Sequence, residues 1–150
     1  MNVIKLLKKD HDRIKALFEQ FERAGKLSYL RKAEIFEQVR RELLLHSQPE
    51  EEIFYPAINA IDGGNELIAE AVKEHKEVNE LLTQISRLKP EDARFVDRFE
   101  TLMDNVDHHV DEEEGQIFQF AEENCPPEQL QRLGVEVEER KRALERQLAA

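Results

Sequence analysis

Apolar residues recur along the chain at steps of three and four positions, which is the period of an amphipathic helix. Four such stripes cover residues 4–21, 28–54, 65–88 and 90–117, and a weaker one covers residues 128–148. No segment alternates apolar and polar residues as a strand does. The pattern predicts an all-α fold, an antiparallel up-down four-helix bundle with an appended C-terminal helix. We place the bundle at residues 1–123 and the appended helix at residues 124–150, either packed on the bundle or extending from it.

A polar motif is superimposed on these stripes, and it occurs twice. Each copy is a lone histidine followed, on the next predicted helix, by a His-x-x-x-Glu pair. The copies are His11 with His46 and Glu50, and His75 with His109 and Glu113. Two helical hairpins related by an approximate two-fold axis would bring one histidine from each of four helices together.

These histidines and glutamates lie on stripes that otherwise hold apolar core residues, and residues i and i+4 share one face of a helix. Burying imidazoles and carboxylates without partners costs several kcal/mol per group. A stable bundle therefore needs cations among them, and a metal site would supply these. We expect most of the remaining acidic residues near Glu50 and Glu113 to face solvent or to contact the site from outside.

Helical geometry predicts which residues next to the motif belong to the site. His109 shares a face with apolar residues whereas His108 lies on a polar stripe, so we assign His109 to the site. Tyr55 follows Glu50 by five positions and would point about 140° away on a regular helix, so we expect it to be peripheral. Pro49 removes a backbone hydrogen bond and predicts a kink that alters the alignment of His46 with Glu50.

The net charge and the cysteine content of the chain disfavour several classes of partner and of metal site. The chain has 22 Lys and Arg against 33 Asp and Glu, a net charge of −11, which disfavours nucleic acid and anionic membranes as partners. The single Cys125 excludes an intramolecular disulfide and a cysteine-rich metal site. The sequence has no run of about 20 apolar residues and no apolar signal segment, which predicts a cytoplasmic protein.

The order of these motifs resembles that of the hemerythrin family, specifically the bacterial hemerythrin-like domains, over residues 3 to 122. The resemblance rests on the segments Lys9–His11, Glu50–Pro56 and His109–Glu114. It implies two iron ions joined by an oxo or hydroxo bridge. The implied ligands are His11, His46, His75 and His109 as terminal ligands, with Glu50 and Glu113 bridging. No catalytic residue is implied.

One departure from the family pattern lies at Asn79, where oxygen-carrying members have a fifth histidine. Two octahedral irons bound by four histidines, two bridging carboxylates and one small bridge would keep two coordination positions open. A fifth histidine would leave only one position open. This count favours binding, sensing or detoxification of dioxygen, peroxide or nitric oxide, or a part in iron homeostasis, over reversible oxygen carriage.

The motifs of two other classes of metalloprotein are absent from the sequence. A ferritin-like di-iron oxidase needs Glu-x-x-His pairs and a zinc hydrolase of the common type needs His-Glu-x-x-His, and the sequence contains neither. A metal-free helical interaction module stays open, and it predicts indifference to His46→Ala. We favour a binding or redox protein and leave open a weak peroxidase, catalase-like or oxidase activity. The sequence predicts neither a protein partner nor an oligomeric state.

Overall fold

The computed structural model describes residues 1–25 and 28–149, and within these ranges all regular structure is helical. The helices are α1 (Val3–Arg23), α2 (Tyr29–Pro49), α3 (Tyr55–Asn59), α4 (Asn65–Ser86), α5 (Ala93–Glu112), α6 (Phe118–Asn124) and α7 (Pro127–Ala149). Two π-helical turns, η1 (Glu50–Phe54) and η2 (Glu113–Ile117), continue α2 into α3 and α5 into α6. The predicted all-α class is confirmed.

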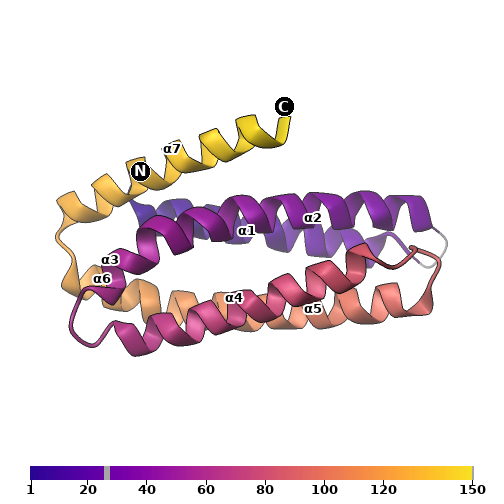
Figure 1. Cartoon of the computed structure of the whole chain (residues 1–150), viewed down its shortest axis with the longest axis horizontal. Coiled ribbons are helices and arrows are strands. Elements are labelled where there is room, and N and C mark those ends of the chain that lie inside the picture. Colours follow the sequence, from indigo (N-terminus) through magenta and orange to yellow (C-terminus); the bar gives the residue numbers. More distant parts are fainter. Residues whose placement is uncertain (26–27, 150) are drawn as a thin grey trace.

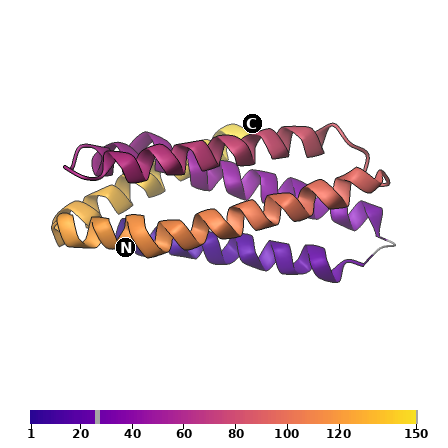
Figure 2. The same cartoon turned by 90° about the horizontal axis from the view of Figure 1, so that it is seen from below.

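Four long helices form an antiparallel bundle in which α1 pairs with α2 and α4 pairs with α5 (Figure 1, Figure 2). The helix that was expected to open at Pro90 begins at Ala93. Asp92 caps it, because its side chain accepts a hydrogen bond of 2.9 Å from the backbone N–H of Arg94, and such caps fix where a helix starts.

The apolar core is divided in two along the bundle. One cluster holds the aromatic residues Phe18, Phe21, Phe36, Phe95 and Phe99. The other holds the first residues of α1, the π turns and the buried face of α7. Along α1 the polar pair formed by Asp10 and His11 lies between residues of the two clusters, so the polar site occupies a layer between two apolar regions.

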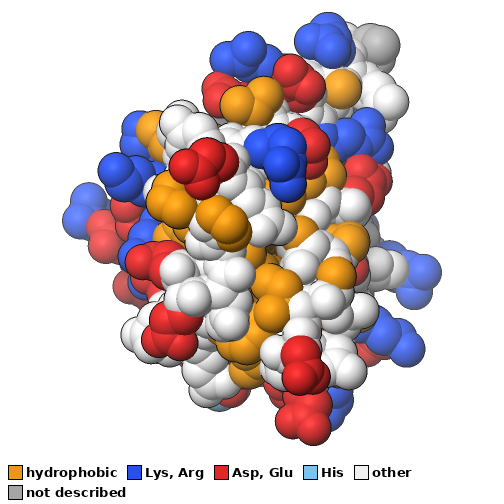
Figure 3. All heavy atoms as spheres, turned by 90° about the vertical axis from the view of Figure 1, so that its left-hand side faces the viewer, with side chains coloured by type: hydrophobic (Ala, Val, Ile, Leu, Met, Phe, Trp, Pro, Cys, Tyr) orange, Lys and Arg blue, Asp and Glu red, His pale blue; other side chains and the backbone are white. Residues whose placement is uncertain are grey.

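Helix α7 lies across α1 and α2 (Figure 1) and also contacts η1. Leu130, Leu133 and Val137 bury its apolar side. At Gly134 a Cβ atom would come within 2.2 Å of the backbone oxygen of Met1, so glycine permits the close approach of α7 to the start of α1. Viewed from the end that carries α3 and α6, apolar side chains reach the surface in the middle of the face (Figure 3).

Two further sequence expectations concern single features. Cys125 lies in the connection between α6 and α7, where it is a buried free thiol. None of the described helices combines the length and the apolar character needed to span a membrane.

Candidate metal centre

All six residues predicted from the repeated motif converge inside the bundle. Two groups of ligand atoms form, and within each group the atoms lie within 4.8 Å of one another. The first group is His11, His46, Glu50 and Glu113, and the second is Glu50, His75, His109 and Glu113. Both glutamates are fully buried, at 0% exposure, and both belong to the two groups. The arrangement is therefore that of two adjacent sites sharing two carboxylates.

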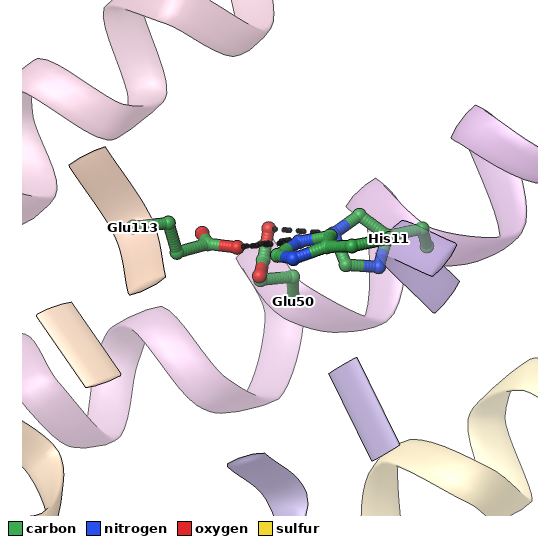
Figure 4. Close-up of side chains that lie close together, drawn as sticks. His11, Glu50 and Glu113 are labelled. Carbon is green, nitrogen blue, oxygen red and sulfur yellow. Dashed lines mark ion pairs between the residues drawn. The ribbon is translucent and has the colours of Figure 1, made fainter. Parts of the chain in front are cut away.

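The histidine Nε2 atoms face these shared carboxylates. His11 Nε2 lies 3.0 Å from Glu113 Oε1, and His75 Nε2 lies 3.2 Å from Glu50 Oε1. Figure 4 shows His11 pointing toward Glu50 and Glu113. His75 and His109 approach each other with 3.1 Å between their Nε2 atoms. Nitrogen and carboxylate oxygen atoms thus meet in one buried layer.

The opposite ring nitrogen of each histidine faces a carboxylate supplied by another helix or turn. The Nδ1 contacts are His11 with Glu114 at 2.7 Å, His46 with Asp10 at 2.9 Å, His75 with Glu51 at 3.3 Å and His109 with Glu74 at 2.7 Å. A carboxylate at Nδ1 favours the tautomer that leaves Nε2 free to bind a metal, and it also fixes the ring orientation. The same device repeats in both halves of the chain.

The buried nitrogen and oxygen atoms of the centre are suited to bind metal ions. Among the described residues, the buried polar atoms without a hydrogen bond include Nε2 of His11, Nε2 of His46, both carboxylate oxygens of Glu50 and Oε1 of Glu113. Leaving such atoms unpartnered is costly, and imidazole with carboxylate is a donor set that first-row transition metals accept. The buried groups are consistent with a binuclear metal site.

The pKa values of the two carboxylates are shifted in opposite directions in the metal-free protein. Burial and the negative charge of Glu113 raise the pKa of Glu50 well above its ordinary value. Burial would also raise the pKa of Glu113, but the nearby imidazoles of His109 and His11 bring it well below its ordinary value. Protons therefore occupy positions that metal ions would take, which couples metal binding to proton release.

The histidines also differ from one another. Burial would lower the pKa of His109, but hydrogen bonds to Glu113 and Glu74 raise it to about 9. Burial lowers the pKa of His46 to about 4 despite its hydrogen bond to Asp10. Burial would also lower the pKa of His11, but the carboxylate of Glu113 raises it, so each pair of histidines contains one whose protonated form is stabilised.

Each site glutamate begins a π turn. The backbone N–H of Tyr55 bonds to the carbonyl of Glu50, and that of Phe118 bonds to the carbonyl of Glu113, both five residues back. Pro49 precedes only one of the two turns, so proline is not a requirement for them. His46 Nε2 stays 3.5 Å from Glu50 Oε1, so the pair remains together despite the predicted kink.

The prediction that Tyr55 is peripheral was wrong. Its side chain is 2% exposed. The hydroxyl donates a short hydrogen bond to Glu113 and lies 3.3 Å from His75 Nε2. The prediction assumed a regular helix, whereas the bond from residue i+5 back to residue i in a π turn returns Tyr55 to the face that carries Glu50.

The remaining assignments concern neighbours of the site. His109 is buried and lies 3.4 Å from Glu113 through its Nε2 atom, while His108 is 66% exposed. Asn79 is exposed and lines a surface groove together with Leu44. In the second copy of the motif Phe118 takes the place of Tyr55, and its ring stacks on His11 with 5.8 Å between ring centroids.

Sequence reasoning did not assign a role to Asp10 or Glu74. Each directly precedes a site histidine, in Asp10-His11 and Glu74-His75, yet each contacts the histidine of the following long helix. An acidic residue before the lone histidine in both copies is the signal that could have identified them.

Comparison with known proteins agrees with this geometry. The chain resembles the crystal structure of a hemerythrin HHE cation binding domain-containing protein, the Rv2633c homologue from Mycobacterium kansasii, with a TM-score of 0.79 and 28% identity, over 95% of this chain and 86% of that one. It is 28% identical to a DNA nickase of Nostoc sp. in an alignment that covers 99% of this chain and 41% of that protein. It is 31% identical to an uncharacterized hemerythrin-like protein of Schizosaccharomyces pombe over 59% of this chain and 44% of that one.

The chain thus spans less than half of the length of these two curated relatives. The family model described as the hemerythrin HHE cation binding domain matches residues 2–121. This range contains all four helices of the bundle and both copies of the His and Glu motif. The chain belongs to the hemerythrin HHE cation-binding domain family.

Proposed function

We propose that the centre holds two iron ions and that the protein binds, senses or detoxifies a small oxidant such as dioxygen, peroxide or nitric oxide. The ligands would be His11, His46, Glu50, His75, His109 and Glu113. The observation that carries this proposal is the pair of buried ligand groups sharing Glu50 and Glu113, with inward-facing nitrogen and oxygen atoms that lack hydrogen-bond partners. Bound iron would supply electron exchange with the small molecule.

The chain's own groups prepare the site for this role. Carboxylates hydrogen-bonded to Nδ1 of His11, His46 and His109 orient these three imidazoles before any metal arrives. The Tyr55 hydroxyl holds a proton at Glu113, since burial and the nearby carboxylates raise the pKa of this tyrosine well above its ordinary value. Its oxygen lies against His75 and His109, so it would lie beside a metal ion that these two histidines held.

The two sides of the centre differ in polarity, and this difference indicates where a small ligand would bind. Beside His75 and His109 lies the hydroxyl of Tyr55. Beside His11 lies the ring of Phe118, which has no polar atom. We infer that the position open to a small, weakly polar oxidant is on the side of His11 and His46, where Leu7 and Phe54 of the same apolar cluster exclude water.

The match to a DNA nickase does not extend the proposal to nucleic acid. The chain covers 41% of that relative, and a net charge of −11 opposes approach to a phosphate backbone.

The first test is the metal content of the purified protein. We expect about two irons per chain, and we expect His46→Gln and Glu113→Gln to lose iron because each removes a ligand atom from a shared group. Arg41→Gln, at an exposed position of α2, is the control and should retain full iron content. Metal-free protein that unfolds cooperatively and gains no stability from added iron would instead support a metal-free interaction module.

The second test uses the iron-loaded protein. Addition of peroxide or nitric oxide should change its absorption spectrum if a coordination position is open. A protein that contains iron but gives no spectral response to either molecule would refute the role toward small oxidants while leaving the metal site intact.

A further inference from the structure

A second group of potential metal ligands lies on the outer surface of α4 and α5. His108 Nε2 is 3.0 Å from Glu112 Oε1 and 3.6 Å from Glu74 Oε2. The exposures of these side chains are 66% for His108, 35% for Glu112 and 10% for Glu74. One imidazole and two carboxylates, with ligand atoms within 4.8 Å of one another, form a donor set suited to a divalent cation such as Fe²⁺ or Mn²⁺.

This outer group touches the buried centre through a single side chain. Glu74 directs Oε2 toward His108 while its other oxygen, Oε1, lies 2.7 Å from Nδ1 of the site residue His109. A residue of the outer group and a residue of the buried centre are therefore in direct contact.

A cavity also borders residues of both groups. It has a volume of about 180 Å³ and runs between α4 and η2. Its lining includes Glu74 and Glu112 of the outer group and Glu113 of the centre. Glu113 is fully buried, and its Oε1 atom has no hydrogen-bond partner.

The charge of this cavity favours cations. Glu66 and Glu70 line it as well, and no Lys or Arg side chain is among its lining residues. Clefts lined by one sign of charge concentrate ions of the opposite sign and speed their association.

We propose that Glu74, His108 and Glu112 form a surface entry site for a divalent cation, from which the ion passes along the acidic cavity to Glu113 and the buried centre. Three protein ligands at a solvent-exposed position bind a cation less tightly than the buried groups do, because water competes for the remaining coordination positions. Weak binding suits an entry site, since the ion must leave it to move inward.

The test uses metal-free, full-length protein and two readouts. Electron paramagnetic resonance of added Mn²⁺ counts bound ions, and the time course of Fe²⁺ uptake gives the loading rate of the centre. The variants are His108→Ala and Glu112→Gln, at positions where the side chain is well exposed or half-buried. Glu80→Gln removes an exposed carboxylate of α4 away from the cavity and is the matched control.

We expect both variants to bind one Mn²⁺ fewer than Glu80→Gln and to load Fe²⁺ on the order of tenfold more slowly, with the same final iron content. An unchanged Mn²⁺ count would show that His108 forms ion pairs only, and an unchanged loading rate would show that ions enter elsewhere. Either result overturns the proposal. The final iron content, measured in the same samples, reports separately on the buried centre.

Discussion

The hydroxyl of Tyr55 is the hydrogen-bond donor to the fully buried carboxylate of Glu113. Phe118 occupies the corresponding position after the second π turn and offers no such donor. A single oxygen atom therefore makes the two halves of a repeated structure chemically different.

Tyr55→Phe should lower the free energy of unfolding of the metal-free protein by about 1–3 kcal/mol. The ring can still pack between Phe54 and His75, so the loss comes from a buried carboxylate that has lost its donor. Urea unfolding measures the effect, with Tyr29→Phe as the control because Tyr29 is 43% exposed. Equal stability of the two variants would contradict the assigned hydrogen bond.

At the scale of elements, α7 is joined to the centre by charged side chains. Lys141 of α7 is buried and forms a short ion pair with Asp10, whose other oxygen contacts His46 Nδ1 at 2.9 Å. Arg140 forms an ion pair of 2.7 Å with Glu52 of η1. The sequence left open whether this helix packs on the bundle or extends from it. In the structure its buried lysine completes a chain of contacts that ends on a site histidine.

Lys141→Met should destabilise the protein by about 1–3 kcal/mol, because it leaves the buried carboxylate of Asp10 without its buried cation. Burial would raise the pKa of Asp10, but hydrogen bonds and charge from His46 and Lys141 lower it to about 2. Thermal or urea unfolding gives the measurement. Arg142→Met, which breaks an exposed pair with Glu138, should stay within about 0.5 kcal/mol of the unaltered protein. A similar loss in both variants would argue against the role of Lys141.

The π turns show what local sequence reasoning lacks. The helical stripes, the His and Glu motif and the choice of His109 over His108 could all be predicted, because a regular helix relates sequence spacing to direction. The inward position of Tyr55 could not be predicted, because nothing in the five residues from Glu50 to Phe54 distinguishes a π turn from a regular helical turn. In the folded protein this turn begins at Glu50, whose carboxylate lies beside His75 of another helix.

At the scale of the whole molecule, folding and metal binding are linked through the protons of the centre. His109 has a pKa of about 9 in the folded protein against an ordinary value of 6.5. A raised pKa means that this group stabilises the metal-free fold fully below pH 6.5 and that the contribution is lost as the pH rises through about 9. Metal ions bind the neutral imidazole, so metal affinity rises over the same range.

The melting temperature of the metal-free protein should therefore fall between pH 6.5 and about 9, by an amount equivalent to a few kcal/mol. That of the iron-loaded protein should change less, so the stabilisation by metal should widen with pH. Calorimetry on both forms across this range makes the comparison. Parallel curves would contradict the assignment of His109 as a protonated group that the metal displaces.

The sequence by itself determined which residues are helical, which faces are buried and which six side chains meet, because all three follow from a repeated periodicity and from the cost of burying polar groups without partners. The boundary at residue 123 remains a prediction, as does the identity of the metal. Only the tertiary structure decided the pairing of each histidine with a distant carboxylate, the inward position of Tyr55 and the attachment of α7 through Lys141. These contacts join residues far apart in the chain, and their geometry depends on how whole helices pack, which the spacing along one helix does not contain.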